Sequence, residues 1–126
     1  KEILGRELIG GRSLRRELWG QIDKSRALSP AQKARALRLL EQAPEGARAC
    51  HGDFHPDNVM VQGERACVLD WANLAAGHPL MDIARTAFLL QFAALPPGLT
   101  AEEQARLAAM RRWGAEAYLR AMDVEP

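Results

Sequence analysis

The feature that most constrains this chain is the stretch 50–61, which reads CHGDFHPDNVMV. It holds two of the chain's three histidines and two aspartates within eight residues, and apolar residues bracket it. A further acid, Asp70, ends the next apolar run at 66–69. A single residue of this kind is usually a turn residue whose side chain caps backbone amides. The combination is more specific, because an acid and an amide precede a hairpin that returns a second acid.

The hairpin consists of two short apolar runs, 59–62 and 65–69, which read as strands. Gly63-Glu64 between them fits a two-residue turn with glycine first. Antiparallel pairing would bring Asn58 close to Asp70, and amide and carboxylate oxygens are ligands that suit Mg²⁺. Asp53 could orient an attacking hydroxyl or accept its proton. Metal ligands with an orienting acid and no covalent nucleophile indicate phosphoryl transfer.

Helical periodicity dominates the rest of the sequence. It predicts helices at about 13–26, 29–42, 80–95 and 100–122, and capping-box patterns mark two of their starts. The segment 80–95 is strongly apolar, so we expect that helix to be buried on most sides. The expected inner face of the last helix consists of Leu107, Met110, Trp113, Ala117 and Tyr118. We therefore predict one mainly α domain over 1–126 with a small β-hairpin, an α+β fold.

Composition narrows the class of protein. The 17 basic and 16 acidic residues nearly balance, which argues against a nucleic-acid platform. No apolar run is long enough to span a membrane, and two cysteines without a signal peptide do not indicate a disulfide scaffold. A cytoplasmic protein is the expectation. The first residue is Lys1 rather than Met, so we expect a piece of a longer chain.

Three motifs carry a resemblance to a known family. The stretch 51–58, HGDFHPDN, resembles the catalytic loop H-R-D-x-x-x-x-N of the protein-kinase-like fold. It is most similar to the H-G-D form of the aminoglycoside phosphotransferase family, which includes choline-kinase-like and other small-molecule kinases. Leu69-Asp70-Trp71 resembles the metal-binding acid of that family, and 77–85 resembles its G-x-P-x-x-D-x-A-R segment. The resemblance covers about 50–90 well.

The resemblance implies roles for six residues. Asp53 in the catalytic loop, 50–58, would be the catalytic base or the acidic residue that orients the hydroxyl. Asn58 and Asp70, at the ends of the metal hairpin 58–70, would hold Mg²⁺ on the phosphates of ATP. His55 would touch phosphate or substrate. His51 and Asp82 would support the loop structurally.

The same resemblance implies a two-lobed enzyme of which this chain is the helical C-lobe. No glycine-rich loop or strand lysine of an N-lobe is identifiable, so we expect the N-lobe to be a missing partner and the fragment alone to be inactive. An open face could favour a homodimer. Only eleven residues separate Asp70 from Asp82, too few for a peptide-docking segment, so the acceptor should be a small molecule.

Other interpretations remain open at the sequence level. The chain could be a kinase-like lobe that only binds and does not catalyse, or a Mg²⁺-dependent hydrolase on another fold. A zinc site could be built from Cys50, His51, His55 and Cys67, although the set has no close C-x-x-C pair.

Overall fold

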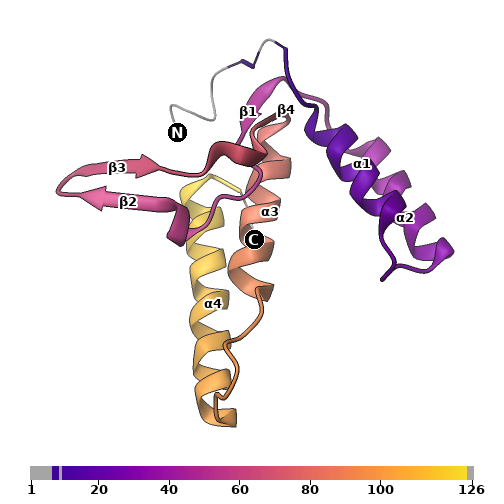
Figure 1. Cartoon of the computed structure of the whole chain (residues 1–126). Coiled ribbons are helices and arrows are strands. Elements are labelled where there is room, and N and C mark those ends of the chain that lie inside the picture. Colours follow the sequence, from indigo (N-terminus) through magenta and orange to yellow (C-terminus); the bar gives the residue numbers. More distant parts are fainter. Residues whose placement is uncertain (1–6, 9, 125–126) are drawn as a thin grey trace. The chain divides into compact units, whose positions relative to one another are not determined.

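The computed structural model of the chain describes residues 7–8 and 10–124, and within them the fold is mainly helical with two small antiparallel sheets (Figure 1). The elements in chain order are α1 (Leu14–Lys24), α2 (Pro30–Gln42), β1 (Arg48–Cys50), η1 (Pro56–Asn58), β2 (Val59–Gln62), β3 (Arg65–Val68), η2 (Trp71–Asn73), β4 (Ala75–Gly77), α3 (Pro79–Phe92) and α4 (Ala101–Ala121). This confirms the predicted α+β class. The chain forms two compact units, one built from 7–8, 10–52 and 71–81 and the other from 53–70 and 82–124.

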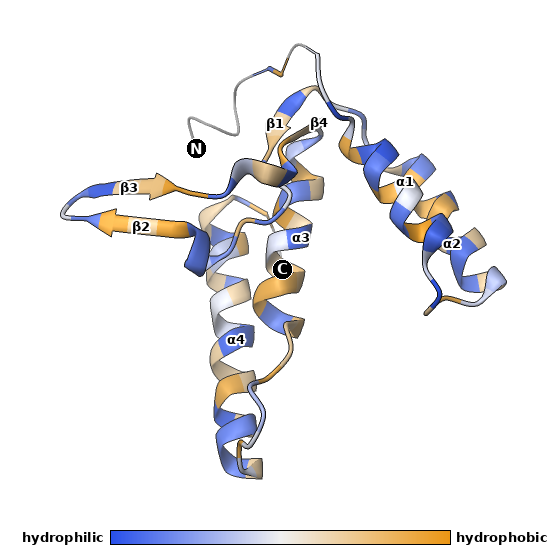
Figure 2. Ribbon diagram, viewed as in Figure 1, coloured by the Kyte–Doolittle hydropathy of each residue, from blue (hydrophilic) through white to orange (hydrophobic). Residues whose placement is uncertain are grey.

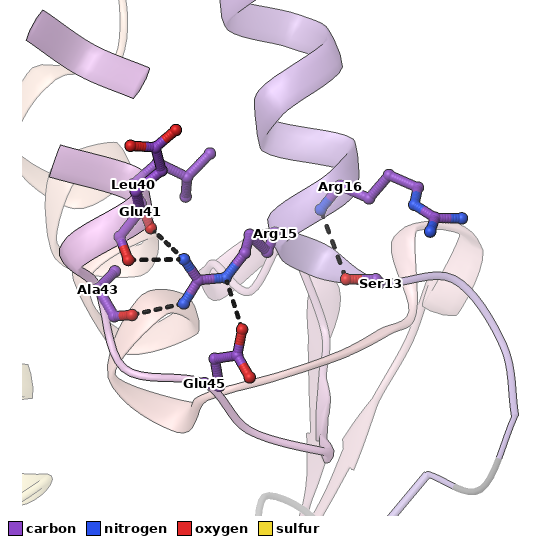
Figure 3. Close-up of polar contacts among 7 residues, drawn as sticks. All are labelled: Ser13, Arg15, Arg16, Leu40, Glu41, Ala43 and Glu45. Atoms are coloured by element: carbon purple, nitrogen blue, oxygen red, sulfur yellow. Dashed lines mark hydrogen bonds and ion pairs between the residues drawn. The ribbon is translucent and has the colours of Figure 1, made fainter. Parts of the chain in front are cut away.

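In the first unit, one arginine ties α1 to the end of α2 (Figure 3). Arg15 Nη1 donates to the carbonyl oxygens of Leu40 at 2.5 Å and Glu41 at 3.2 Å, and Nη2 donates to that of Ala43 at 2.5 Å. The last carbonyls of a helix have no partner within the helix, and a cation there also complements the helix dipole. The guanidinium therefore ends α2 and holds α1 beside it.

The first unit also contains a sheet that the sequence did not reveal. Strand β1 pairs with β4 in antiparallel register, so that Cys50 lies opposite Ala75 and Arg48 opposite Gly77. Gly77 sits where a Cβ would come within 2.9 Å of the Leu14 side chain, which explains the glycine. Leu14, Cys50 and Ala75 form the buried core of this unit.

In the second unit, β2 and β3 form the predicted hairpin. Val59 lies opposite Val68 and Gln62 opposite Arg65, which leaves Gly63 and Glu64 as the two-residue turn. Gly63 has φ +59°, the left-handed conformation that the first position of such a turn requires. Figure 2 shows that apolar residues run along both strands. Met60 and Val61 are exposed.

The helices of the second unit correct two predictions. Helix α3 is not buried on most sides, because only Asp82, Ile83 and Thr86 are buried on it and Phe88 and Phe92 are each 61% exposed. An apolar composition shows that a helix could be buried but not how many elements cover it.

No helix in the described ranges is long and apolar enough to cross a membrane.

The predicted inner face of α4 is also wrong in part. Met110 and Trp113 are exposed, at 61% and 66%, whereas Ala115 is the residue that this helix buries. Leu107 and Tyr118 are partly buried, as expected. Arg111 donates to the carbonyl oxygens of Ala93 and Ala94, just after α3. A side-chain bond to the end of the neighbouring helix thus supports this pair of helices in place of a continuous apolar seam.

Candidate functional site

The site begins where the chain leaves β1. His51 is 1% exposed, and its ring lies 4.7 Å from that of Trp71 in the first unit. Gly52 follows with φ +77°, and a Cβ there would come within 2.8 Å of the carbonyl oxygen of Asn73. Both the conformation and the close approach require glycine. The burial of His51 agrees with a structural part in the loop, which remains a prediction.

Beyond Gly52 the loop is organised by Asn58, at the end of the short helix η1. Its Nδ2 donates to the main-chain carbonyl of Asp53 at 2.9 Å and lies 3.2 Å from His55 Nε2. Asp53 O can only accept, so the atom facing it must be the amide nitrogen. The same nitrogen has a second hydrogen for His55 Nε2, which leaves the ring hydrogen on Nδ1. One side chain therefore closes the loop from Asp53 to Asn58.

The Asp53 carboxylate faces two nitrogen-bearing side chains. Its Oδ2 lies 3.7 Å from His55 Nε2, and its Oδ1 lies 3.6 Å from Arg85 Nη2 on α3. The Asp53 side chain is 31% exposed, so it is both braced and open to an incoming molecule. Sequence reasoning gave Arg85 no role beyond its place in a motif. The sequence feature that could have revealed Arg85 is its position one helical turn after Asp82, which places both residues on one side of α3.

The hairpin brings the two predicted metal ligands to the same end. Leu69 N donates to Asn58 O at 2.8 Å, so Asp70 follows directly after the residue paired with Asn58. Both hydrogen bonds of the Asn58 side chain use Nδ2, which leaves Oδ1 for a cation. Asp70 is exposed and has φ +55°, a left-handed conformation that aspartate tolerates better than most residues. An amide oxygen and a carboxylate at one hairpin end fit the donor set of Mg²⁺.

Asn58 and Asp70 do not by themselves make up a cluster of conventional metal-binding residues. Within 7–8 and 10–124, no three His, Cys, Asp or Glu side chains are grouped so that they could hold a metal ion. Cys50 is buried in the first unit, and Cys67 is an exposed free thiol on β3 of the second unit.

Asp82 is 3% exposed in the first turn of α3, and its support of the loop remains a prediction. Tyr118 of α4 lies in the same unit, with its ring 6.2 Å from that of Phe54. Burial raises the pKa of Tyr118, and the Asp82 charge acts in the same direction, whereas the neighbouring Thr86 hydroxyl opposes them. The neutral phenol is therefore the form that this packing favours.

The geometry agrees with the kind of loop and hairpin that the motifs indicated. Asp53, His55, Asn58 and Arg85 lie in contact within the second unit, and Asp70 stands at the hairpin end beside them in register. The model of the phosphotransferase enzyme family (APH) matches the sequence over residues 6–120. The chain belongs to this phosphotransferase family. The match confirms the resemblance to aminoglycoside phosphotransferases that the three motifs carried. Neither a search of curated proteins nor one of solved structures found a match.

Proposed function

We propose that this phosphotransferase-family chain takes part in the transfer of the γ-phosphoryl group of ATP to a hydroxyl group of a small molecule. The observation that carries the proposal is the setting of Asp53, a partly exposed carboxylate whose main chain is held by Asn58 and whose Oδ1 faces the Arg85 guanidinium. The acceptor oxygen forms a bond to the γ-phosphorus, the bond from that phosphorus to the bridging oxygen breaks, and ADP leaves. The hydroxyl proton passes to the Asp53 carboxylate and then to water.

Each neighbour contributes by position. Arg85 Nη2 lies 3.6 Å from one carboxylate oxygen and the His55 ring lies 3.7 Å from the other, and this crowding limits the directions from which a hydroxyl can approach. Preorganised geometry of this kind supplies much of the catalysis in phosphoryl transfer. A phosphate contact by the His55 ring would use its Nδ1–H, because Nε2 accepts from Asn58. In this structure His55 Nδ1 lies 3.7 Å from Asp57 Oδ2.

Asn58 Oδ1 and the Asp70 carboxylate are the groups that would hold Mg²⁺. The ion would neutralise charge on the phosphates of ATP. The chain's own contribution is to keep the amide oxygen turned outward, since both amide hydrogens are engaged on the loop side. The hairpin then fixes how far Asp70 lies from it along the backbone.

The short segment that follows Asp70 favours a small acceptor molecule. The eleven residues 71–81 are taken up by η2, by β4 paired with β1, and by the start of α3. No length is left there for a loop that could present a peptide. The proposed partners are therefore a small molecule and ATP, together with an N-lobe that covers the nucleotide. A lobe that binds without catalysis is the alternative, and turnover measurements separate the two.

The test is Asp53→Asn in the full-length gene product. Loss of a general base costs on the order of 10²–10⁴ in rate, so turnover should fall by at least about a hundredfold with nucleotide affinity little changed. Glu64→Gln is the control, because Glu64 is an exposed acid in the turn of the hairpin and its replacement removes the same charge. It should change turnover only a few-fold. Near-normal turnover of Asp53→Asn, or an equal loss in both variants, would refute the assignment.

A further inference from the structure

A cavity of about 640 Å³ lies in the second unit, with Asp53 in its wall. Its other walls come from the loop residues His55, Pro56 and Asp57, from α3 and the residue that follows it, Ala93, and from α4. Sites for small organic ligands span roughly 300–1,000 Å³. The cavity therefore has the volume to hold a molecule while one of its hydroxyl groups meets Asp53, the proposed general base.

The walls are mostly apolar. Leu89 and Leu90 of α3 face it, as do Leu107, Met110 and Trp113 of α4. Figure 2 shows that apolar residues gather on α3 in this unit. The exposure of Met110 and Trp113, unexplained by packing between the helices, is accounted for if a ligand covers them.

The charges around the cavity do not suit a cation. The Asp53 carboxylate already faces Arg85 and His55, and Arg111 adds a positive charge whose donors point to the carbonyl oxygens that follow α3. Taking an ammonium group from water into apolar walls is costly unless a carboxylate pairs with it. The walls hold one further carboxylate, Asp57, whose side chain is 97% exposed and lies 3.7 Å from His55 Nδ1. A molecule with several ammonium groups would therefore find too few desolvated carboxylates here.

We propose that the acceptor is an alcohol whose body is apolar and carries no positive charge, and that this cavity binds it. The inference rests on the proposed function, since it places the hydroxyl of the alcohol at Asp53. The apolar body lies against Met110, Trp113 and the two leucines of α3. Polycationic amino sugars are excluded by the same walls.

The probes are 4-phenyl-1-butanol, a neutral aryl alcohol, and kanamycin, a polycationic amino sugar. Each is titrated into the full-length gene product while the methyl signals of methionine and leucine and the indole N–H signals are followed by NMR. The alcohol should shift the signals of Leu89, Leu90, Met110 and Trp113. Kanamycin should leave them in place.

Met110→Gln tests the wall and Met60→Gln is its matched control. The two methionines lie in the same unit and are similarly exposed, at 61% and 58%, but Met60 is on the hairpin strand β2 and does not line this cavity. Met110→Gln should weaken binding of the alcohol about tenfold, the usual effect of a lost apolar contact in a pocket. Met60→Gln should leave it unchanged.

Three results would overturn the inference. They are binding of kanamycin at these residues, equal weakening by both glutamine variants, and no response at Leu89, Leu90 or Met110 because another segment or copy covers the cavity. A parallel assay of transfer from Mg²⁺–ATP separates the two proposals. Specific binding of the alcohol with no transfer to either probe would support the ligand class and refute the phosphotransferase proposal. Transfer to kanamycin alone would support the phosphotransferase and overturn the apolar acceptor.

Discussion

Replacing Asn58 by aspartate tests whether one amide holds the catalytic loop together. The substitution keeps the shape of the side chain but turns its donor into an acceptor. Two hydrogen bonds are lost, to Asp53 O at 2.9 Å and to His55 Nε2 at 3.2 Å. Each is worth about 0.5–1.5 kcal/mol net, so the free energy of unfolding should fall by about 1–3 kcal/mol. The new carboxylate also faces a carbonyl oxygen, which places the expected loss in the upper part of that range.

The assay is urea unfolding followed by far-ultraviolet circular dichroism, with a chelator present so that no cation contributes. The midpoint should fall while the slope against urea stays unchanged, because the surface exposed on unfolding is the same. Asn73→Asp is the control. Asn73 is the chain's other asparagine, and it is exposed, so it introduces the same charge without breaking a side-chain hydrogen bond. A loss below about 0.5 kcal/mol for Asn58→Asp, or an equal loss for the control, would refute the reasoning.

Three further predictions concern the loop and the helices. Gly52→Ala should destabilise the fold by more than about 1–2 kcal/mol in the same assay, because a left-handed conformation is added to a clash with Asn73; a neutral effect would contradict the loop geometry. Tyr118 is the only tyrosine, so phenolate absorbance reports it alone, and the phenolate should form only above the ordinary pKa of 10.0. The stability that the neutral phenol adds is complete below that pH and is lost as pH rises through the folded pKa. Hydrogen bonds from Thr100 lower the pKa of Glu103 below 4.5, so the N-terminal cap of α4 should persist above that pH and be lost as pH falls through the folded pKa, which exchange of the first amides of α4 would measure.

The features that the sequence predicted are those with short-range causes. The capping boxes of α2 and α4 and the turn of the hairpin depend on residues within three positions of each other, and all are present. The pairing of Asn58 with the end of β3 follows from the turn length alone, because a two-residue turn fixes the register. The order of the proposed site residues along the chain was therefore enough to place them at one end of a hairpin.

The features that were missed depend on residues far apart in the sequence. The ion pair of Asp53 with Arg85 joins a loop to a helix, and the pairing of β1 with β4 joins strands of three residues each. Strands this short carry no measurable alternation of apolar and polar residues. The exposure of Met110 and Trp113 was missed because helical spacing gives the direction of a side chain but not what lies opposite it.

The hydrogen bond from Asn58 to residue 53 ends on a main-chain atom. The closure of the loop therefore does not depend on the side chain at position 53, whereas the proposed activity does. Any residue at position 53 offers the same carbonyl oxygen, so an inactivating substitution there leaves the loop closed. Such a variant would resist proteolysis and reach normal abundance, because quality control responds to unfolding and not to lost activity. A screen that scores protein levels would miss it. The inert protein would still occupy ligands and partners that active copies need.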